Sequence, residues 1–433
     1  MVEISASAGG EHTLFYDSKT KSLFSAGACG LGWCRNYPLN EALFHLRKVK
    51  LGESKPCRLV HASYYHNLAV DATKGQLYTW GCGTFVDHAK DGTPNLDGVI
   101  PALGPRANTT DLGEPPQPIA LVHNDPYNTK DPIVGLSAGA YHSVVLTRLG
   151  IVYTFGAGQL GQLGRHSTSD KTDSSGLLVD PTPAPIQGID FGQDKVEAIG
   201  AGFYNTFAIV GSSGSLYCAG ENQNKQCGEG PRNLREMVRV KEIGDTVESV
   251  EGGYCHTLVK TAAGKVLSLG CGEEGQRGDG RLIDEDGDEA DDIEPREIVT
   301  PVVLPKGRNA IVIAAGANHS VVLGDDGVAY TFGANDVGQC GVSSKDADGE
   351  EGAPVLSPHA VKIPKDAGQV IGISAGYAHT VLTTSKEGVF VFGQNDNGQL
   401  GIGGKGAQSG GDINHEPSLR PVEVEIKQHK LWS

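Results

Sequence analysis

Short apolar stretches alternate with clusters of glycine and polar residues along the whole chain. Typical stretches are Val152-Tyr-Thr-Phe-Gly156 and Ala329-Tyr-Thr-Phe-Gly333. Runs of this length, rich in valine, aromatic residues and threonine and bounded by glycine, are typical of β-strands. The 61 glycines, with frequent aspartate and asparagine between the runs, indicate tight turns. The pattern therefore predicts many short strands joined by turns.

One unit recurs seven times along the chain: an apolar strand, Gly-x-x-His or a close variant, a second strand, a turn and a third strand ending in glycine. The histidine position of the successive copies is held by His12, His66, His142, Asn205, His256, His319 and His379. We expect a fourth strand before each unit, as at 118–122, 185–189, 301–305 and 360–364. The fold class is then all-β, a seven-bladed β-propeller of four-stranded blades stabilised by the stacking of neighbours around a closed ring.

The ends of the chain predict how the ring closes. The first copy starts at residue 3 with no strand before it, and Arg420-Pro-Val-Glu-Val-Glu-Ile426 carries the missing pattern. We expect this C-terminal strand to complete the first blade and so to cover a sheet edge. The chain, 1–433, is then a single propeller domain with insertions at about 84–132, 165–182, 281–298, 342–357 and 403–417.

The composition indicates the setting of the protein. No window holds the roughly 20 apolar residues of a membrane span, and residues 1–8 lack the basic start and apolar stretch of a secretory signal. The nine cysteines include no Cys-x-x-Cys pair, which favours reduced thiols over a disulfide framework or a zinc knuckle. We therefore expect a cytoplasmic or nuclear protein, or one found in both compartments, with no membrane contact.

The net charge of −16 disfavours direct binding to nucleic acid, because such affinity depends on lysine and arginine neutralising phosphates. A protein partner that is basic or neutral fits this charge. The acidic surface also has a simpler interpretation, since net charge keeps a protein soluble.

A glycine-rich spacing and one acidic segment resemble known ligand loops. Gly156-Ala-Gly158-Gln-Leu-Gly161 has the spacing of a dinucleotide-binding loop, but no helix pattern follows, and Gly270-Cys-Gly272-Glu-Glu-Gly275 repeats the spacing in another copy. The spacing therefore belongs to the repeat, and no cofactor is predicted. The acidic segment 284–294 fails the calcium-loop register, because Glu289 stands where glycine is required. It is interpreted as a solvated loop, with a contact to a basic partner as the alternative.

The repeat motifs together resemble a known family. Gly-x-x-His-[Ser/Thr], the Tyr-Thr-[Trp/Phe]-Gly strands and the Gln-x-Gly turns at Gln162, Gln226, Gln276, Gln339 and Gln399 are similar to those of the regulator of chromosome condensation repeat family. The resemblance implies a seven-bladed propeller. The family's founding member is a nucleotide exchange factor for the small GTPase Ran, with acidic residues just before the repeat histidines. Of the equivalent residues in this chain, Glu11 alone is acidic.

The loops that precede the repeat histidines are the predicted partner-binding site. Circular stacking places the seven loops around one end of the central channel, and aromatic residues are enriched in them although they form only 6% of the chain. The predicted binding residues are Glu11, Tyr64, Tyr65, Tyr141, Phe203, Tyr204, Tyr254, Asn318 and Tyr377. Clustered aromatic side chains are typical of binding hot spots. The alternative is that the rings only cover the channel mouth and pack on each other.

The histidine position itself is interpreted as structural. A side chain that recurs once per blade is expected to fix its turn by a hydrogen bond, and an amide such as Asn205 can serve the same role. No metal site and no catalytic residues are predicted. The function we expect is a protein–protein interaction propeller, with residues 84–132 as an arm onto the partner or a plain loop. The alternative function is guanine-nucleotide exchange on a Ran-like small GTPase.

Overall fold

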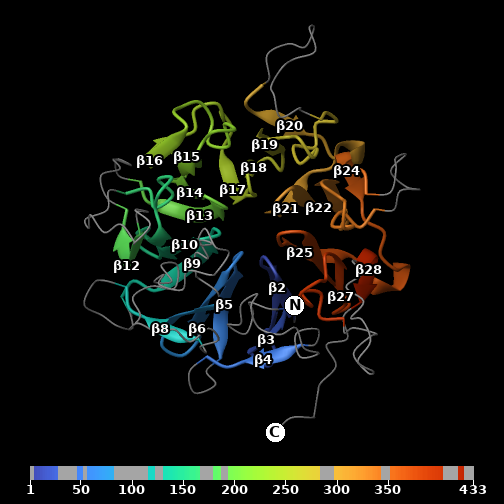
Figure 1. Ribbon diagram of the computed structural model, residues 1–433, viewed down its shortest axis with the longest axis horizontal. Helices are drawn as coiled ribbons and strands as arrows, with labels where there is room; N and C mark the ends of the chain where they lie inside the picture. The colour runs from blue at the N-terminus through green and yellow to red at the C-terminus, as the bar shows by residue number, and fades with distance from the viewer. Residues whose placement is uncertain are drawn as a thin grey trace, which may run out of the picture.

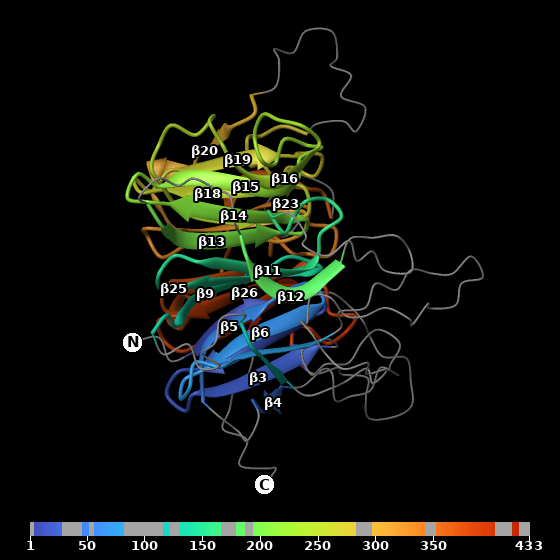
Figure 2. The ribbon, with the colours of Figure 1, turned by 90° about the vertical axis from the view of Figure 1, so that its left-hand side faces the viewer.

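The protein is a ring of seven four-stranded antiparallel sheets arranged around a central axis (Figure 1). The computed structural model describes residues 4–27, 46–51, 56–81, 116–121, 130–165, 179–186, 194–282, 297–342, 352–402 and 418–423. Viewed from the side, the strands run from one face of the ring to the other (Figure 2). The predicted seven-bladed, all-β propeller is confirmed.

The sheets are called blades 1 to 7 in chain order. The strands of blades 1 to 4 are β1 (Ile4–Ala8), β2 (His12–Asp17), β3 (Ser22–Gly27), β4 (Arg47–Val49), β5 (Cys57–Ala62), β6 (His66–Asp71), β7 (Leu77–Gly81), β8 (Gln117–Ile119), β9 (Ile133–Ala138), β10 (His142–Thr147), β11 (Val152–Ala157), β12 (Val179–Pro185), β13 (Val196–Gly202), β14 (Asn205–Val210), β15 (Ser215–Glu221) and β16 (Asn233–Arg239). The strands of blades 5 to 7 are β17 (Val247–Gly252), β18 (His256–Thr261), β19 (Val266–Gly270), β20 (Thr300–Val302), β21 (Ala310–Ala315), β22 (His319–Gly324), β23 (Ala329–Gly333), β24 (Val355–Ala360), β25 (Val370–Ala375), β26 (His379–Thr384), β27 (Val389–Gly393) and β28 (Ser418–Glu423).

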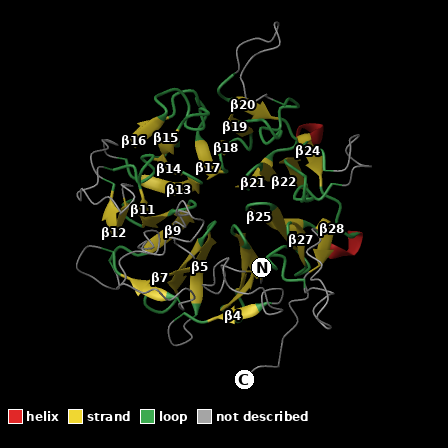
Figure 3. Ribbon diagram, in the orientation of Figure 1, coloured by secondary structure: helices red, strands yellow, loops and turns green. Residues whose placement is uncertain are grey.

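Helix is confined to two short 3-10 turns in the described part of the chain, η4 (Pro305–Gly307) and η5 (Lys365–Ala367) (Figure 3). No helix among the described residues is long and apolar enough to cross a bilayer.

The repeat position begins the second strand of every blade, and a glycine at the end of the third strand, or one residue before its end, lies opposite it. In blade 6, for example, His319 pairs with Gly333, which has φ +108°. A Cβ atom at Gly333 would lie 2.6 Å from the Cα of His319, so a side chain at this position would overlap the backbone of the second strand. The left-handed backbone and the close approach together explain why the third strand ends in glycine.

The hydrophobic core lies between the blades rather than within any one of them. Each of seven clusters of buried side chains joins two neighbouring blades. Blades 7 and 1 are joined in this way by Phe15, which packs with Val381 and Val391 at 0–1% exposure. A single blade would leave both of its faces in water, so blade stacking supplies the burial that stabilises the fold.

The ring does not close as the sequence predicts. The C-terminal strand β28 pairs with β27 of blade 7, with Val422 opposite Val391, and blade 1 is completed by its own β4, where Val49 lies opposite Leu23. Every fourth strand belongs to the unit before it, so the prediction that the C-terminal strand completes the first blade is wrong. The Pro-Val pattern identifies a strand but not its partner, and the free edge of the third strand of the same unit is the nearest partner available. Blades 7 and 1 instead pack face to face.

The predicted insertions follow the third strands. Most of their residues lie outside the described part of the chain. The outer strand β8 lies within the predicted segment 84–132, and the outer strands β12 and β24 begin within the predicted segments 165–182 and 342–357 and extend beyond them. The predicted segments 281–298 and 403–417 also separate the third and fourth strands of a blade. Because the third strands run parallel to the first, they end on the ring face that carries the loops before the repeat histidines.

Candidate functional site

The loops between the first and second strands are joined to each other around the mouth of the central channel. A main-chain N–H of one loop donates to a carbonyl of the next at 2.9–3.2 Å: Gly10 to Ser63, Ala140 to Phe203, Phe203 to Gly253, Tyr254 to Ala317, Ala317 to Tyr377 and Tyr377 to Gly9. Between blades 2 and 3 the Ser63 hydroxyl donates to the carbonyl of Gly139. The loops thus form one continuous ring whose geometry is fixed by the stacked blades.

The aromatic side chains predicted from these loops lie together on this ring. Tyr64 of blade 2 reaches across the axis, with its ring centroid 4.8 Å from that of Phe203 in blade 4 and 5.0 Å from that of Tyr377 in blade 7. Phe203 is also 4.9 Å from Tyr254. These edge-to-face and tilted contacts have favourable geometry for aromatic pairs. The four rings form a lid over the end of the channel.

A second row of rings lies outside the lid. Tyr141 stacks between Tyr65 and Tyr204, with centroid separations of 5.0 and 6.1 Å. Burial and the neighbouring hydroxyls raise the pKa of Tyr65 and of Tyr204, so both phenols stay neutral. We call the seven residues Tyr64, Tyr65, Tyr141, Phe203, Tyr204, Tyr254 and Tyr377 the aromatic crown.

The crown is accessible from solvent. Tyr254 and Tyr377 are 44% and 38% exposed, and the other crown residues are half-buried. Asn318, in the equivalent loop of blade 6, is also half-buried. Glu11 occupies the equivalent position in blade 1 but is only 4% exposed, so it does not contribute to the accessible surface. The structure thus brings the predicted aromatic residues together and leaves out the predicted acidic one.

The repeat histidines form a second, buried ring beneath the crown. Each Nε2 atom contacts a side-chain oxygen of the next blade: His12 to Asn67 (2.5 Å), His66 to Ser143 (2.7 Å), His142 to Thr206 (3.0 Å), His256 to Ser320 (3.0 Å), His319 to Thr380 (2.9 Å) and His379 to Thr13 (2.9 Å). The sequence predicts a bond that fixes the histidine's own turn. The bond instead crosses to the neighbouring blade, which makes the histidine a joint between blades.

The hydroxyls of this ring are held by the Gln-x-Gly turns. Four of them donate to the carbonyl oxygen of the preceding blade's glutamine at 2.6–2.8 Å: Thr13 to Gln399, Thr206 to Gln162, Ser320 to Gln276 and Thr380 to Gln339. Thr257, at the equivalent position of blade 5, donates to Gln226 in the same way at 2.8 Å. A hydroxyl has one hydrogen, so it accepts from the histidine, whose proton is thereby assigned to Nε2. The glutamine turn, the histidine and the hydroxyl therefore form one unit.

Burial keeps these histidines neutral. Loss of hydration lowers the pKa of His12 and His142 to about 4, and that of His66, His256, His319 and His379 to about 3. Within the described ranges, no three His, Cys, Asp or Glu side chains are grouped so that they could hold a metal ion. In the described part of the chain these histidines form a buried network of contacts between blades.

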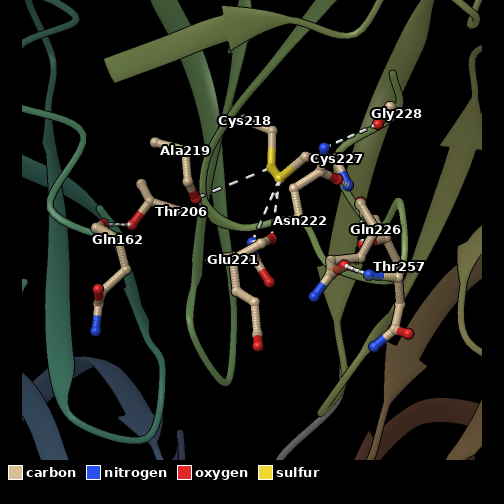
Figure 4. Close-up of a disulfide and its surroundings, with 12 residues drawn as sticks. Gln162, Thr206, Cys218, Ala219, Glu221, Asn222, Gln226, Cys227, Gly228 and Thr257 are labelled. Carbon is tan, nitrogen blue, oxygen red and sulfur yellow. Dashed lines mark hydrogen bonds between the residues drawn. A yellow bond between two sulfur atoms is a disulfide. The ribbon is translucent and has the colours of Figure 1, made fainter. Parts of the chain in front are cut away.

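Blade 4 departs from this network because Asn205 replaces the histidine. Its Nδ2 donates to the carbonyl of Glu221 at 2.6 Å and approaches the Cys227 sulfur at 3.3 Å, both within its own blade. The predicted equivalence of the amide with histidine is therefore not seen. A disulfide between Cys218 and Cys227 ties the glutamine turn of this blade to its third strand (Figure 4). Thr257 of blade 5 still donates to the Gln226 carbonyl in that turn (Figure 4).

The disulfides correct the expectation of reduced thiols. Besides Cys218–Cys227, a second bond joins Cys255, just before a repeat histidine, to Cys271, just after the third strand of the same blade. Cys57 and Cys340 remain free and buried. The sequence did hold a signal, because Cys255 and Cys271 flank the paired residues His256 and Gly270, which register places opposite each other.

The comparisons with known proteins agree with this architecture. The family model for the RCC1-like domain matches residues 1–354 and 99–431. The ultraviolet-B receptor UVR8 of Arabidopsis thaliana is 29% identical over 78% of this chain and 65% of the receptor. Protein pim1 of Schizosaccharomyces pombe is 31% identical over 50% of this chain and 40% of that protein. The regulator of chromosome condensation of Drosophila melanogaster is 29% identical over 62% of this chain and 46% of that protein. The chain thus aligns with less than two thirds of the length of each of these relatives.

Solved structures show the same fold. Prp20p of Saccharomyces cerevisiae superposes with a TM-score of 0.71 at 18% identity, covering 98% of this chain and 88% of that one. Human WBSCR16 superposes with a TM-score of 0.67 at 19% identity, covering 93% and 90%.

Proposed function

This chain belongs to the family of RCC1-like domains, and from that premise we propose that it is an interaction propeller that binds a protein partner through the aromatic crown. The family resemblance predicted from the repeat motifs is confirmed. One fold of this kind serves many activities, so the proposal depends on the surface that this chain presents.

The continuity of the crown supports the proposal most directly. Seven aromatic residues from five blades follow one another ring to ring with centroids 4.2–6.1 Å apart, and the loops that carry them are hydrogen-bonded to each other around the ring. Rigid aromatic side chains lose little conformational entropy on binding and are enriched in binding hot spots. A preformed apolar surface of this kind suits a protein partner.

The named relatives point in the same direction. The crystal structure of Prp20p was described together with its binding properties to Gsp1p and histones, and another structure holds Kap60 bound to yeast RCC1. For this chain, the net charge of −16 favours a basic or neutral protein and disfavours nucleic acid. We also propose that the protein is found in the cytoplasm, in the nucleus or in both.

Affinity capture with paired variants tests the crown. Tyr141→Ala with Tyr204→Ala removes two stacked outer rings. The hydrogen bonds between the loops are made by main-chain atoms, which the substitutions leave in place, so we expect the fold to be retained. The control, Ile311→Ala with Val238→Ala, removes two exposed apolar side chains outside the crown loops, at 51% and 40% exposure. We expect the crown variant to lose partners that the control retains. Identical partner sets for wild type and crown variant would contradict the proposal.

The alternative function is guanine-nucleotide exchange on a Ran-like small GTPase, which the relative named regulator of chromosome condensation favours. Release of a fluorescent nucleotide from a panel of purified small GTPases separates the two functions. Stoichiometric binding without release supports an interaction propeller. Faster release at catalytic amounts of the protein supports exchange, and the crown variant then shows whether the same face is used.

A further inference from the structure

A cavity of about 250 Å³ lies in the centre of the ring, directly beneath the aromatic crown. All seven blades line it with the first strand and the following loop, and much of the lining is small residues such as Gly139 and Ala201. Tyr64, Phe203 and Tyr377 of the lid form its upper part. The cavity is smaller than the roughly 300–1,000 Å³ of pockets that hold drug-sized molecules. Its size suits one inserted side chain.

One layer of the channel carries its polar side chains. The layer consists of the residue five positions before the repeat histidine or asparagine of each blade. In all seven blades this residue pairs with the residue two positions after the repeat position, so the seven residues lie at the same height along the channel axis. They are Ser7, His61, Ser137, Gly200, Glu251, Ala314 and Ser374. Four of them, Ser7, His61, Glu251 and Ser374, line the cavity with polar groups.

Three of these four polar groups bond to the neighbouring blade. The Ser7 hydroxyl accepts the N–H of Ala62 at 2.8 Å, and the Ser374 hydroxyl accepts the N–H of Ala8 at 2.9 Å. The His61 ring is hydrogen-bonded to the main chain of Ala138. The side chain of Glu251 forms no hydrogen bond or ion pair with the described part of the chain. Its carboxylate is thus available to a ligand.

The electrostatics of the layer favour a cation. Burial raises the pKa of Glu251 to about 7, because nothing nearby compensates for its lost hydration. Burial lowers the pKa of His61 to about 4, so this ring is neutral at physiological pH. The cavity lining contains no lysine or arginine among the described residues. A cation beside Glu251 would supply the missing compensation without meeting like charge.

The lid adds a second element of cation recognition. The methylene stem of a lysine or arginine packs along apolar rings while its charged end reaches a polar group, and the cation itself is attracted to ring faces within about 6 Å as it passes them. Tyr377 belongs both to the lid and to the cavity lining, and it is 38% exposed, so it connects solvent to the layer below.

We infer that the cavity beneath the crown is an anchor pocket for one lysine or arginine side chain of the protein partner, with the lid rings around its stem and Glu251 at its charged end. This inference rests on the proposed function and specifies the chemistry of the partner. It assigns a role to a carboxylate that the repeat itself does not require, since the equivalent position in the other blades holds serine, histidine, glycine or alanine.

Small cations that mimic the two side chains test the pocket without a partner. Saturation-transfer NMR on the full chain measures binding of methylguanidinium and n-butylammonium, with N-methylurea and n-butanol as neutral counterparts. We expect saturable binding of at least one cation, at least tenfold weaker binding of its neutral counterpart, and at least tenfold weaker binding to Glu251→Gln. The matched control is Glu197→Gln, which makes the same chemical change at an exposed glutamate of β13. It should bind as wild type does.

A loss of binding by Glu251→Gln can be interpreted because this variant is expected to fold. Glu251→Gln removes a carboxylate whose charge is disfavoured by burial, so it should fold and melt at or above the wild-type temperature at pH 8. Equal binding to wild type and Glu251→Gln, equal binding of the neutral molecules, or no saturable binding of either cation would overturn the inference. None of these results affects partner capture by the crown, whose failure would instead appear as identical partners for wild type and the Tyr141/Tyr204 variant.

Discussion

The Nε2 atom of His379 in blade 7 lies 2.9 Å from the Oγ1 atom of Thr13 in blade 1, although 366 residues separate them in the chain. Thr13 in turn donates to the carbonyl of Gln399 at 2.8 Å. Among the described residues no strand crosses from blade 7 to blade 1. This buried polar unit, the packing of Phe15 against Val381 and the bonds of Tyr377 to Gly9 and of Ala8 to Ser374 therefore hold the ring closed.

Replacing His379 with alanine should therefore weaken ring closure. The change leaves a cavity at a fully buried site and removes one of the two partners of the Thr13 hydroxyl, so we expect the free energy of unfolding to fall by about 2–4 kcal/mol. Urea-induced unfolding measures it. The control is His359→Ala on the outer strand β24, where the side chain is half-buried, with an expected loss below about 1 kcal/mol. Equal decreases in the free energy of unfolding for the two variants would show that the contact between His379 and Thr13 does not stabilise the ring.

Replacing Gly376 with alanine should also destabilise the ring. The His379 ring lies over this glycine, and an added Cβ would come within 2.6 Å of Nδ1 and would also meet the Gly9 carbonyl of blade 1. We expect a loss of roughly 1–3 kcal/mol from overpacking. Gly244→Ala is the matched change, because nothing lies within 4 Å of its Cβ position. Differential scanning calorimetry should show a lower Tm for Gly376→Ala alone. A similar Tm for both variants would refute the idea that the histidine ring leaves no room for a side chain at the glycine of Gly-x-x-His.

Stability should fall as the pH drops below about 6.5. An unfolded histidine titrates near pH 6.5, whereas the six repeat histidines have folded pKa values of about 3–4. The unfolded chain therefore binds more protons in this window, and stability that is fully present above pH 6.5 is lost as the pH falls toward 4. Each histidine contributes roughly 1 kcal/mol per pH unit below pH 6.

Unfolding by urea at several pH values from 7.5 to 4.5 tests this dependence. Replacing His319 with glutamine should reduce the slope by about one histidine's share, even where the variant is less stable overall. A slope identical to that of wild type would mean that His319 is not buried in its neutral form.

Removing the Cys218–Cys227 bond should loosen blade 4. The bond closes a loop with a sequence separation of 9, for which chain entropy predicts a stabilisation of about 2–3 kcal/mol. Cys218→Ala with Cys227→Ala should lose about that amount in urea unfolding. Cys340→Ala is the control, since Cys340 is a free thiol in the equivalent turn of blade 6. Mass spectrometry of unreduced peptides checks the bond itself, and an unlinked Cys218 peptide would contradict it.

The repeat made much of the candidate site predictable. Equivalent residues of stacked units reach the same height on the ring, so the aromatic residues before each histidine had to gather at one end of the channel. That expectation needed no knowledge of individual contacts. The same argument failed for Glu11, because its burial depends on the surroundings of one loop rather than on its place in the repeat.

Other features could not be read from the pattern. The motif locates each histidine but not the direction of its bond, which depends on the distance to the next blade. Glu251 and His61 look like ordinary residues of a strand until the ring places them in one polar layer. The Cys218–Cys227 disulfide likewise depends on side-chain geometry within a single blade.

The sequence by itself determined the number of blades, the position of three strands in each, and the face on which the variable loops meet, because these follow from local periodicity repeated along the chain. Only the tertiary structure decided which blade each fourth strand joins, how the ring closes and which polar groups line its axis. Those features are set by contacts between distant segments, and hydrophobic and polar patterns carry no information about which neighbour a strand edge or a side chain will meet.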